Sequence, residues 1–201
     1  MLLLSASVLT ARPCGRGSGK AGACSTLSDS KTSVVLSASA IEALRFQIDE
    51  ERMAGELYRA FGEKWAIRPF KNIPRAEDRH HALLVKLASR AGLPLAEVTK
   101  AGRYESSVIQ TRYHSLLAQG EASLTEALSA GAFVEEQDIA DLHSLVAATD
   151  NEDLKSVASV LEVGSQNHLR AFVRNLRSRG IDYAPQILTE EELAGIIAAR
   201  N

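Results

Sequence analysis

The sequence has very little cysteine, and none of it lies in the main part of the chain. The 201 residues include two cysteines, Cys14 and Cys24, both close to the N-terminus. If that N-terminal segment is removed, the protein can have no disulfide, no cysteine nucleophile and no thiolate metal site. Any metal ion would then need carboxylate and imidazole ligands.

The chain also lacks a strong excess of charge and a long apolar run. Its formal net charge is -2 and its sequence pI is about 6.2, which excludes the basic surface that nucleic acid or anionic lipid would require. After the N-terminal segment, no run reaches the roughly 18 apolar residues that a membrane span needs. We therefore expect no nucleic-acid partner, no membrane span, and one domain with a tail.

The first 36 residues differ in composition from the rest. They are rich in Ser, Ala and Gly, and three basic residues precede the first acidic one, Asp29. This composition predicts a targeting segment outside the packed domain, of the kind that directs proteins to a plastid or mitochondrion. Two alternatives stay open: a secretory signal, which implies a secreted or periplasmic protein, and a disordered tail. Residues 37–201 would then form the single domain.

Strand-like alternation is absent, and after Ser39 the apolar residues recur every three or four positions, which predicts an all-α protein. A short helical pattern at 108–117 lies in a long connection between the second and third helices, and Thr189 begins a short terminal helix. Two helical hairpins joined by one long crossover are typical of a ferritin-like four-helix bundle. The four long helices are expected at 39–68, 73–91, 123–149 and 152–179.

Capping signals mark the starts of these helices. Ser39 and Glu42 form a capping-box pattern at the first helix, and Ser123 and Glu126 form another at the third. Asn72 is expected to cap the second helix, which tolerates the proline that follows in its first turn.

Polar residues interrupt the apolar inner rows of all four helices. Buried carboxylates cost several kcal/mol unless they are paired or bind a metal. Two hypotheses follow: a site for one or two ions, where carboxylate with imidazole favours iron or manganese, or a hydrogen-bonded network in a metal-free structural or interaction module. The inner-row residues are Glu51, Glu77, His80, Glu135, Asp138 and His168.

Two positions allow more than one interpretation. Glu135 and Glu136 are adjacent, so one of them is expected to face outward, and the helical phase does not decide which. Tyr58 follows Glu51 by seven residues, about 10 Å along the same face. Its hydroxyl could bond a ligand or act as a redox-active catalytic group, or it could bond a backbone carbonyl in the core.

The blocks EERMAGELY, NIPRAEDRHH, VEEQDIADL and SQNHLRAF occur in this order within residues 38–195. Together they resemble a ferritin-like family known only as domain of unknown function 2202, which is distantly similar to rubrerythrins. The resemblance implies a four-helix ferritin-like fold and a di-iron or iron–manganese centre. The ligands it implies are Glu51, Glu77, His80, Glu135 or Glu136, and His168, with Tyr58 behind Glu51.

The fourth helix departs from the di-iron pattern, because Ser165 stands where a second Glu-x-x-His would place its glutamate. Only His168 remains there, and Glu162 or Asp138 would have to supply the charge. We therefore expect a tight site and a weak site, with His80→Ala removing the tight ion and His168→Ala the weak one. Ser165→Glu is expected to strengthen the weak site.

The functional expectation is an oxidoreductase that acts on peroxide or oxygen, or a protein that handles iron. Rubrerythrins often carry a cysteine-rich rubredoxin module for electron delivery, and this chain has none, so electrons would come from an external donor. Iron storage would require a closed homo-oligomeric shell.

Overall fold

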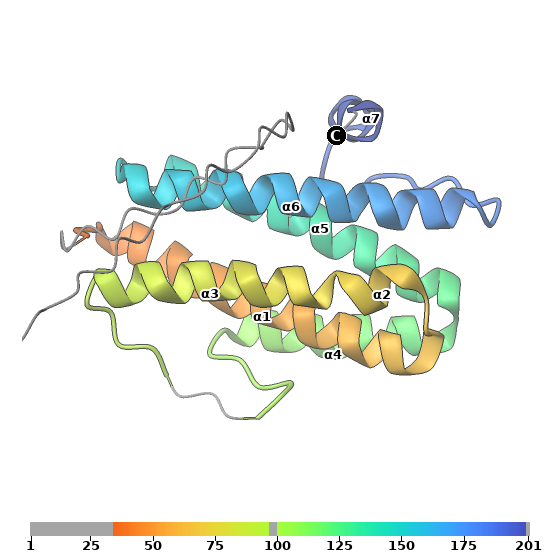
Figure 1. Ribbon diagram of the computed structural model, residues 1–201, viewed down its shortest axis with the longest axis horizontal. Helices are drawn as coiled ribbons and strands as arrows, with labels where there is room; N and C mark the ends of the chain where they lie inside the picture. Colours follow the sequence, from red (N-terminus) through yellow and green to blue (C-terminus); the bar gives the residue numbers. More distant parts are fainter. Residues whose placement is uncertain (1–33, 97–99, 200–201) are drawn as a thin grey trace, which may run out of the picture.

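A computed structural model describes residues 34–96 and 100–199. Within them it shows seven helices and no strand, which confirms the all-α class (Figure 1). The long helices are α1 (Ala38–Trp65), α3 (Pro74–Arg90), α5 (Leu124–Ala147) and α6 (Glu152–Arg177). The others are α2 (Arg68–Asn72), α4 (Ser107–Ala122) and α7 (Glu190–Ala198).

The long helices form two pairs. Helix α1 packs extensively against α3 and α5 against α6, while α1 also contacts α5 and α3 contacts α6 less extensively. In Figure 1 the α5–α6 pair lies above the α1–α3 pair. The connection from α3 to α5 contains α4, which packs against α1 and α5. The described helices do not include one with the length and apolarity needed to cross a bilayer.

The start of α1 differs from the expected one. The Ser37 hydroxyl accepts a hydrogen bond from the Ala40 N–H at 3.2 Å, so the cap is Ser37, two residues before the predicted cap. The predicted cap Ser39 instead lies inside the first turn and bonds the Ser37 hydroxyl. The helix also ends earlier than predicted, because Ala66 adopts a left-handed conformation with φ 41°.

Asn72 does not cap the second long helix, so that prediction was wrong. Residues 68–72 form the separate helix α2, and Ile73 continues with helical dihedrals (φ -60°, ψ -42°) directly into α3. The Glu77 N–H donates to the Ile73 carbonyl at 3.1 Å, so the backbone bonds of α3 start without a side-chain cap. The two helices follow each other with almost no interruption.

Helix α4 is longer than the short pattern predicted at 108–117. The Ser106 hydroxyl caps it, and Ile109 and Leu116 are buried against the neighbouring helices. Arg112 forms an ion pair with the fully buried Glu50 of α1. This pair ties the connection to the body of the protein.

The described chain begins inside the packed structure, since Val34 is buried and its N–H donates to the Arg90 carbonyl at 3.3 Å. Residues 1–33 lie outside the described residues, and the predicted targeting segment falls almost entirely within them.

The hydrophobic core consists of two clusters. One contains Leu44, Leu84, Leu142 and Leu161, and the other contains Tyr58, Phe61, Phe70 and Phe172. On α1, α3 and α6 the buried polar residues occur between the positions that contribute to these two clusters. A polar layer therefore lies inside an otherwise apolar interior.

Candidate metal centre

The four long helices all contribute buried polar side chains to this layer. Glu77 and His80 lie one turn apart on α3, so they share a face. His80 and His168 are 8% and 9% exposed, and the carboxylates are buried more deeply. The other carboxylates are Glu51 on α1 and Glu135 on α5. The structure thus brings all five predicted ligand residues together.

These residues form two groups that share Glu77. The Nδ1 atom of His80 lies 3.0 Å from Glu77 Oε2 and 3.3 Å from Glu51 Oε2. The Nδ1 atom of His168 lies 2.9 Å from Glu77 Oε1 and 3.5 Å from Glu135 Oε2. Within each group, one potential ligand atom from every residue lies within 4.8 Å of the others. Glu77 therefore turns one oxygen toward each imidazole.

One atom of these groups lacks a hydrogen-bond partner. Glu51 Oε1 is buried without one, whereas the buried Glu77 Oε1 and His168 Nδ1 lie 2.9 Å apart and form an ion pair. Buried polar groups are nearly always hydrogen-bonded, so each exception requires an explanation. Carboxylate oxygens and imidazole nitrogens that converge inside a protein are the donor types that fit a metal ion.

Burial and mutual attraction shift the pKa values of these groups in opposite directions. Burial raises the pKa of Glu51 to about 8 despite its contact with His80. Burial also acts to raise the pKa of Glu77, but the two imidazoles outweigh it and lower the pKa to about 2. Burial acts to lower the pKa of both histidines, but the carboxylates raise it to about 10 for His80 and about 11 for His168. Without metal, both imidazoles are therefore protonated at neutral pH.

Tyr58 makes both of the contacts that the sequence left open. Its hydroxyl donates to Glu135 Oε1 at 2.6 Å and lies 3.3 Å from the Gly131 carbonyl oxygen. The ring is fully buried and lies 5.2 Å, between centroids, from Phe172. Burial, reinforced by Glu135, raises the pKa of this phenol well above its ordinary value. The side chain therefore stays protonated and holds Glu135 in place.

Glu135, and not Glu136, points into the site. The expectation that one of the two faces outward was wrong, because both are buried. Glu136 is covered by the segment before α7: the Tyr183 hydroxyl and the N–H groups of residues 186–188 donate to its carboxylate. The sequence alone did not show that this segment returns to α5.

The two groups are more alike than the sequence suggested. Glu135 joins His168 and not His80, so each group has one imidazole, one carboxylate of its own and a share of Glu77. The expected difference between a tight and a weak site therefore does not follow from these ligands.

The surroundings of Ser165 are also different from those expected. Its hydroxyl donates to Asp138 Oδ2, and the Gln47 amide donates to Asp138 Oδ1. Glu162 does not reach the site, since it bonds His143 at 3.1 Å near the surface. Gln47 was missed in the sequence, although it lies three residues after Leu44 on the inner row.

Residues 40–200 match the uncharacterized protein domain DUF2202. The chain belongs to this family. The uncharacterized protein MJ0754 of Methanocaldococcus jannaschii is 36% identical over 152 residues, which cover 75% of this chain and 82% of the relative. The crystal structure of hypothetical protein MJ0754 matches with a TM-score of 0.77, and the match covers 79% of this chain and 91% of that chain. The helical arrangement is therefore that of a solved structure.

This DUF2202 relative contradicts the predicted organelle location. It comes from an archaeon, a cell that has neither plastid nor mitochondrion. The prediction rested on the composition of residues 1–36, but enrichment in Ser, Ala, Gly and Arg is not specific to transit peptides.

Gly164 of this DUF2202 chain makes room for His80. A Cβ atom at Gly164 would lie 2.6 Å from His80 Nε2, so the imidazole would have to move by about 1 Å to reach normal contact. We expect Gly164→Ala to weaken metal binding by the His80 group about tenfold, because ligands must be held within a fraction of an ångström. Calorimetric titration with Mn²⁺ measures this change.

Gly195→Ala provides the matched control. Gly195 also lies in a helix, α7, but a Cβ atom there would meet nothing within 4 Å. This substitution should leave metal binding unchanged and stabilise the protein by about 0.5–1 kcal/mol. Equal metal affinities for the two variants would show that the close approach of Gly164 to His80 has no role in binding.

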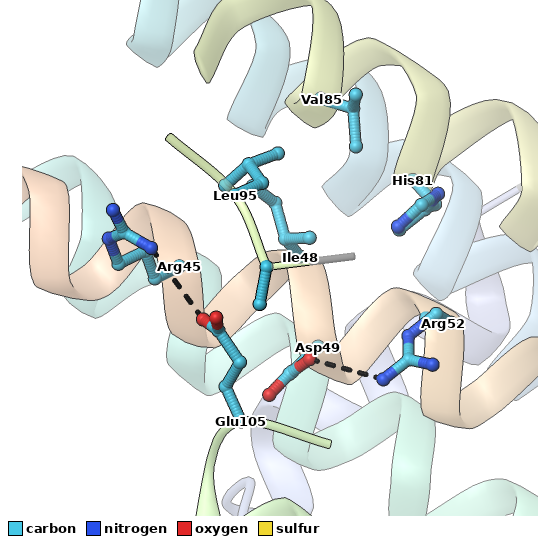
Figure 2. A pocket seen from close by; sticks show the side chains of 9 residues that line it. Arg45, Ile48, Asp49, Arg52, His81, Val85, Leu95 and Glu105 are labelled. Atoms are coloured by element: carbon cyan, nitrogen blue, oxygen red, sulfur yellow. Dashed lines mark hydrogen bonds and ion pairs between the residues drawn. The ribbon is translucent and has the colours of Figure 1, made fainter. Parts of the chain in front are cut away.

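A separate cavity of about 250 Å³ lies between α1, α3 and the connection that follows α3. Figure 2 shows its ion pairs, Arg45 with Glu105 at 3.6 Å and Arg52 with Asp49 at 3.4 Å. His81 lines this cavity, whereas its neighbour His80 does not. The cavity is therefore distinct from the candidate metal centre.

Proposed function

We propose that this protein binds two divalent transition-metal ions, iron or manganese, in the buried layer of a ferritin-like four-helix bundle. One observation carries the proposal: two ligand groups share the two oxygens of Glu77, and Glu51 Oε1 in one of them is buried without a partner. Carboxylates that bridge two metals hold them about 3.5–4 Å apart. The two pairs of long helices with one long connection support the ferritin-like assignment.

The ligand types favour these metals. Oxygen and imidazole donors without thiolate suit iron and manganese, and the two imidazoles distinguish the site from a calcium site. When bound, such a pair of ions supplies electrons for reactions with oxygen or peroxide. We propose this oxidoreductase chemistry, or the handling of iron itself, as the activity.

The residues of the chain have distinct roles in this proposal. His80 and His168 would hold the ions through Nδ1, and the three carboxylates would compensate three of the four positive charges. Tyr58 would orient Glu135, to which its hydroxyl donates, and would serve as a redox-active side chain beside it. No cysteine occurs after Cys24, so a separate donor must deliver electrons.

A second candidate is a metal-free structural or interaction module. It is favoured by the ion pairs of the two protonated histidines with the carboxylates, which partly neutralise the layer without any metal. In that case the polar layer would only specify how the helices pack. Metal content distinguishes the two candidates.

The test is calorimetric titration of the metal-free chain with Mn²⁺ in buffers of different ionisation enthalpy. We expect two ions per chain and the release of about two to three protons at pH 7, because both imidazoles and Glu51 hold protons before binding. Affinity should accordingly rise with pH from 7 toward 10. Absence of binding, together with full thermal stability, would favour the metal-free module.

A further inference from the structure

Asp138 is a fourth buried carboxylate beside the metal centre, but it belongs to neither ligand group. It lies one turn after Glu135 on α5 and is 5% exposed. Its two oxygens accept hydrogen bonds from neutral donors, the Gln47 amide and the Ser165 hydroxyl. In the described part of the chain no basic side chain forms an ion pair with it. A buried carboxylate of this kind is costly unless it compensates a positive charge.

Asp138 lies near the three ligand carboxylates. Burial raises its pKa well above the ordinary value, and the three ligand carboxylates are near enough to raise it further. Its partner Ser165 lies one turn before His168 on α6, the position from which the glutamate of a Glu-x-x-His pair would reach the centre. Helix α6 thus lacks this glutamate, but α5 supplies a carboxylate, that of Asp138. The hydroxyl of Ser165, which occupies the glutamate position on α6, donates a hydrogen bond to it.

The net charge of the two ions and their ligands explains why a further carboxylate would be needed beside them. Two divalent ions carry four positive charges, the three ligand carboxylates carry three negative charges, and the metal-bound imidazoles are neutral. One positive charge would remain in a buried layer, where an uncompensated charge is expensive. The carboxylate of Asp138 brings the total to zero.

We propose that Asp138 supplies the fourth carboxylate charge needed for the second metal ion, and that Ser165 and Gln47 are its positioning residues. The inference rests on the proposed function. Asp138→Asn should weaken binding of the second ion. It also places an NH₂ donor where a carboxylate oxygen now accepts a hydrogen bond, so it should lower the thermal midpoint of the metal-free protein. A purely structural hydrogen-bonding role predicts the same lower midpoint but unchanged binding.

The experiment is calorimetric titration of the full chain with Mn²⁺, with thermal unfolding of the metal-free protein measured in parallel. For Asp138→Asn we expect the first ion to bind as in the wild type and the second to bind about 10–100-fold more weakly. Asp141→Asn is the matched control, because Asp141 lies on the same helix but bonds Gln137 at 3.1 Å and is partly exposed. It should keep both ions at wild-type affinity.

A charge exchange provides a second test. Ser165→Glu alone would place a carboxylate against Asp138, so it should lower stability and not simply strengthen a site. Combined with Asp138→Ser, it returns the carboxylate to α6 and should restore tight binding of the second ion.

The possible failures can be told apart. Two ions at wild-type affinity in Asp138→Asn, with or without a lower midpoint, would overturn the inference but leave the proposed metal centre intact. A wild-type chain that binds no Mn²⁺ would overturn both.

Discussion

Glu77→Gln is expected to abolish the binding of both metal ions. Glu77 is the only residue that belongs to both ligand groups, with Oε2 beside His80 and Oε1 beside His168. Glutamine keeps the shape of the side chain, but it removes the negative charge and replaces one ligand oxygen by an NH₂ group. The loss should exceed the 10–100-fold typical of residues outside the ligand set, for each ion. Titration with Mn²⁺ measures both losses.

Asp78→Asn is the control on the same helix. Asp78 follows Glu77 directly, but it is exposed and pairs with Arg59 on the surface. This change should leave both ions bound. If Glu77→Gln kept one ion at wild-type affinity, the two groups would not share this ligand, and a single-metal site would replace the proposed pair.

The second large effect is expected from Glu136→Gln, which should destabilise the protein without removing metal. Glu136 accepts backbone N–H bonds from Ile187 at 2.9 Å and Leu188 at 3.0 Å, and the Tyr183 hydroxyl also donates to it. A glutamine would place an NH₂ donor where the carboxylate now accepts. The cost should be about 2–3 kcal/mol, which is roughly 5–10 °C in thermal midpoint.

Tyr183→Phe separates the contributions to this interaction. It removes one donor from the Glu136 carboxylate and leaves the backbone donors, so it should cost only about 1 kcal/mol. Denaturant unfolding measures both variants. If Glu136→Gln kept its full stability but lost a metal ion, Glu136 would belong to the centre and the roles of the two adjacent glutamates would be reversed.

The sequence predicted the parts of this molecule that depend on local patterns. The helical period gave the four long helices to within a few residues, because each one buries a single apolar face. The spacing of Glu77 and His80, and the inner position of His168, follow from the same period. These residues meet in the structure because the apolar rows on either side of them pack together.

Contacts between distant segments could not be predicted in this way. Glu136 is buried because residues 183–188 return to α5, and no periodicity in α5 indicates this. Asp138 depends on partners from α1 and α6, so its relation to Ser165 is visible only once these helices are assembled. The helix start at Ser37 shows a smaller limit: two serines in suitable positions compete for the cap, and backbone geometry decides between them.

Anomalous diffraction from crystals of the protein grown with Mn²⁺ would test the proposed metal centre most directly. We expect two peaks at the manganese absorption edge, about 3.5–4 Å apart, with Glu77 between them. One peak should lie beside Nδ1 of His80 and the other beside Nδ1 of His168. A layer without any peak, in which Glu77 contacts only the two protonated imidazoles, would contradict the assignment.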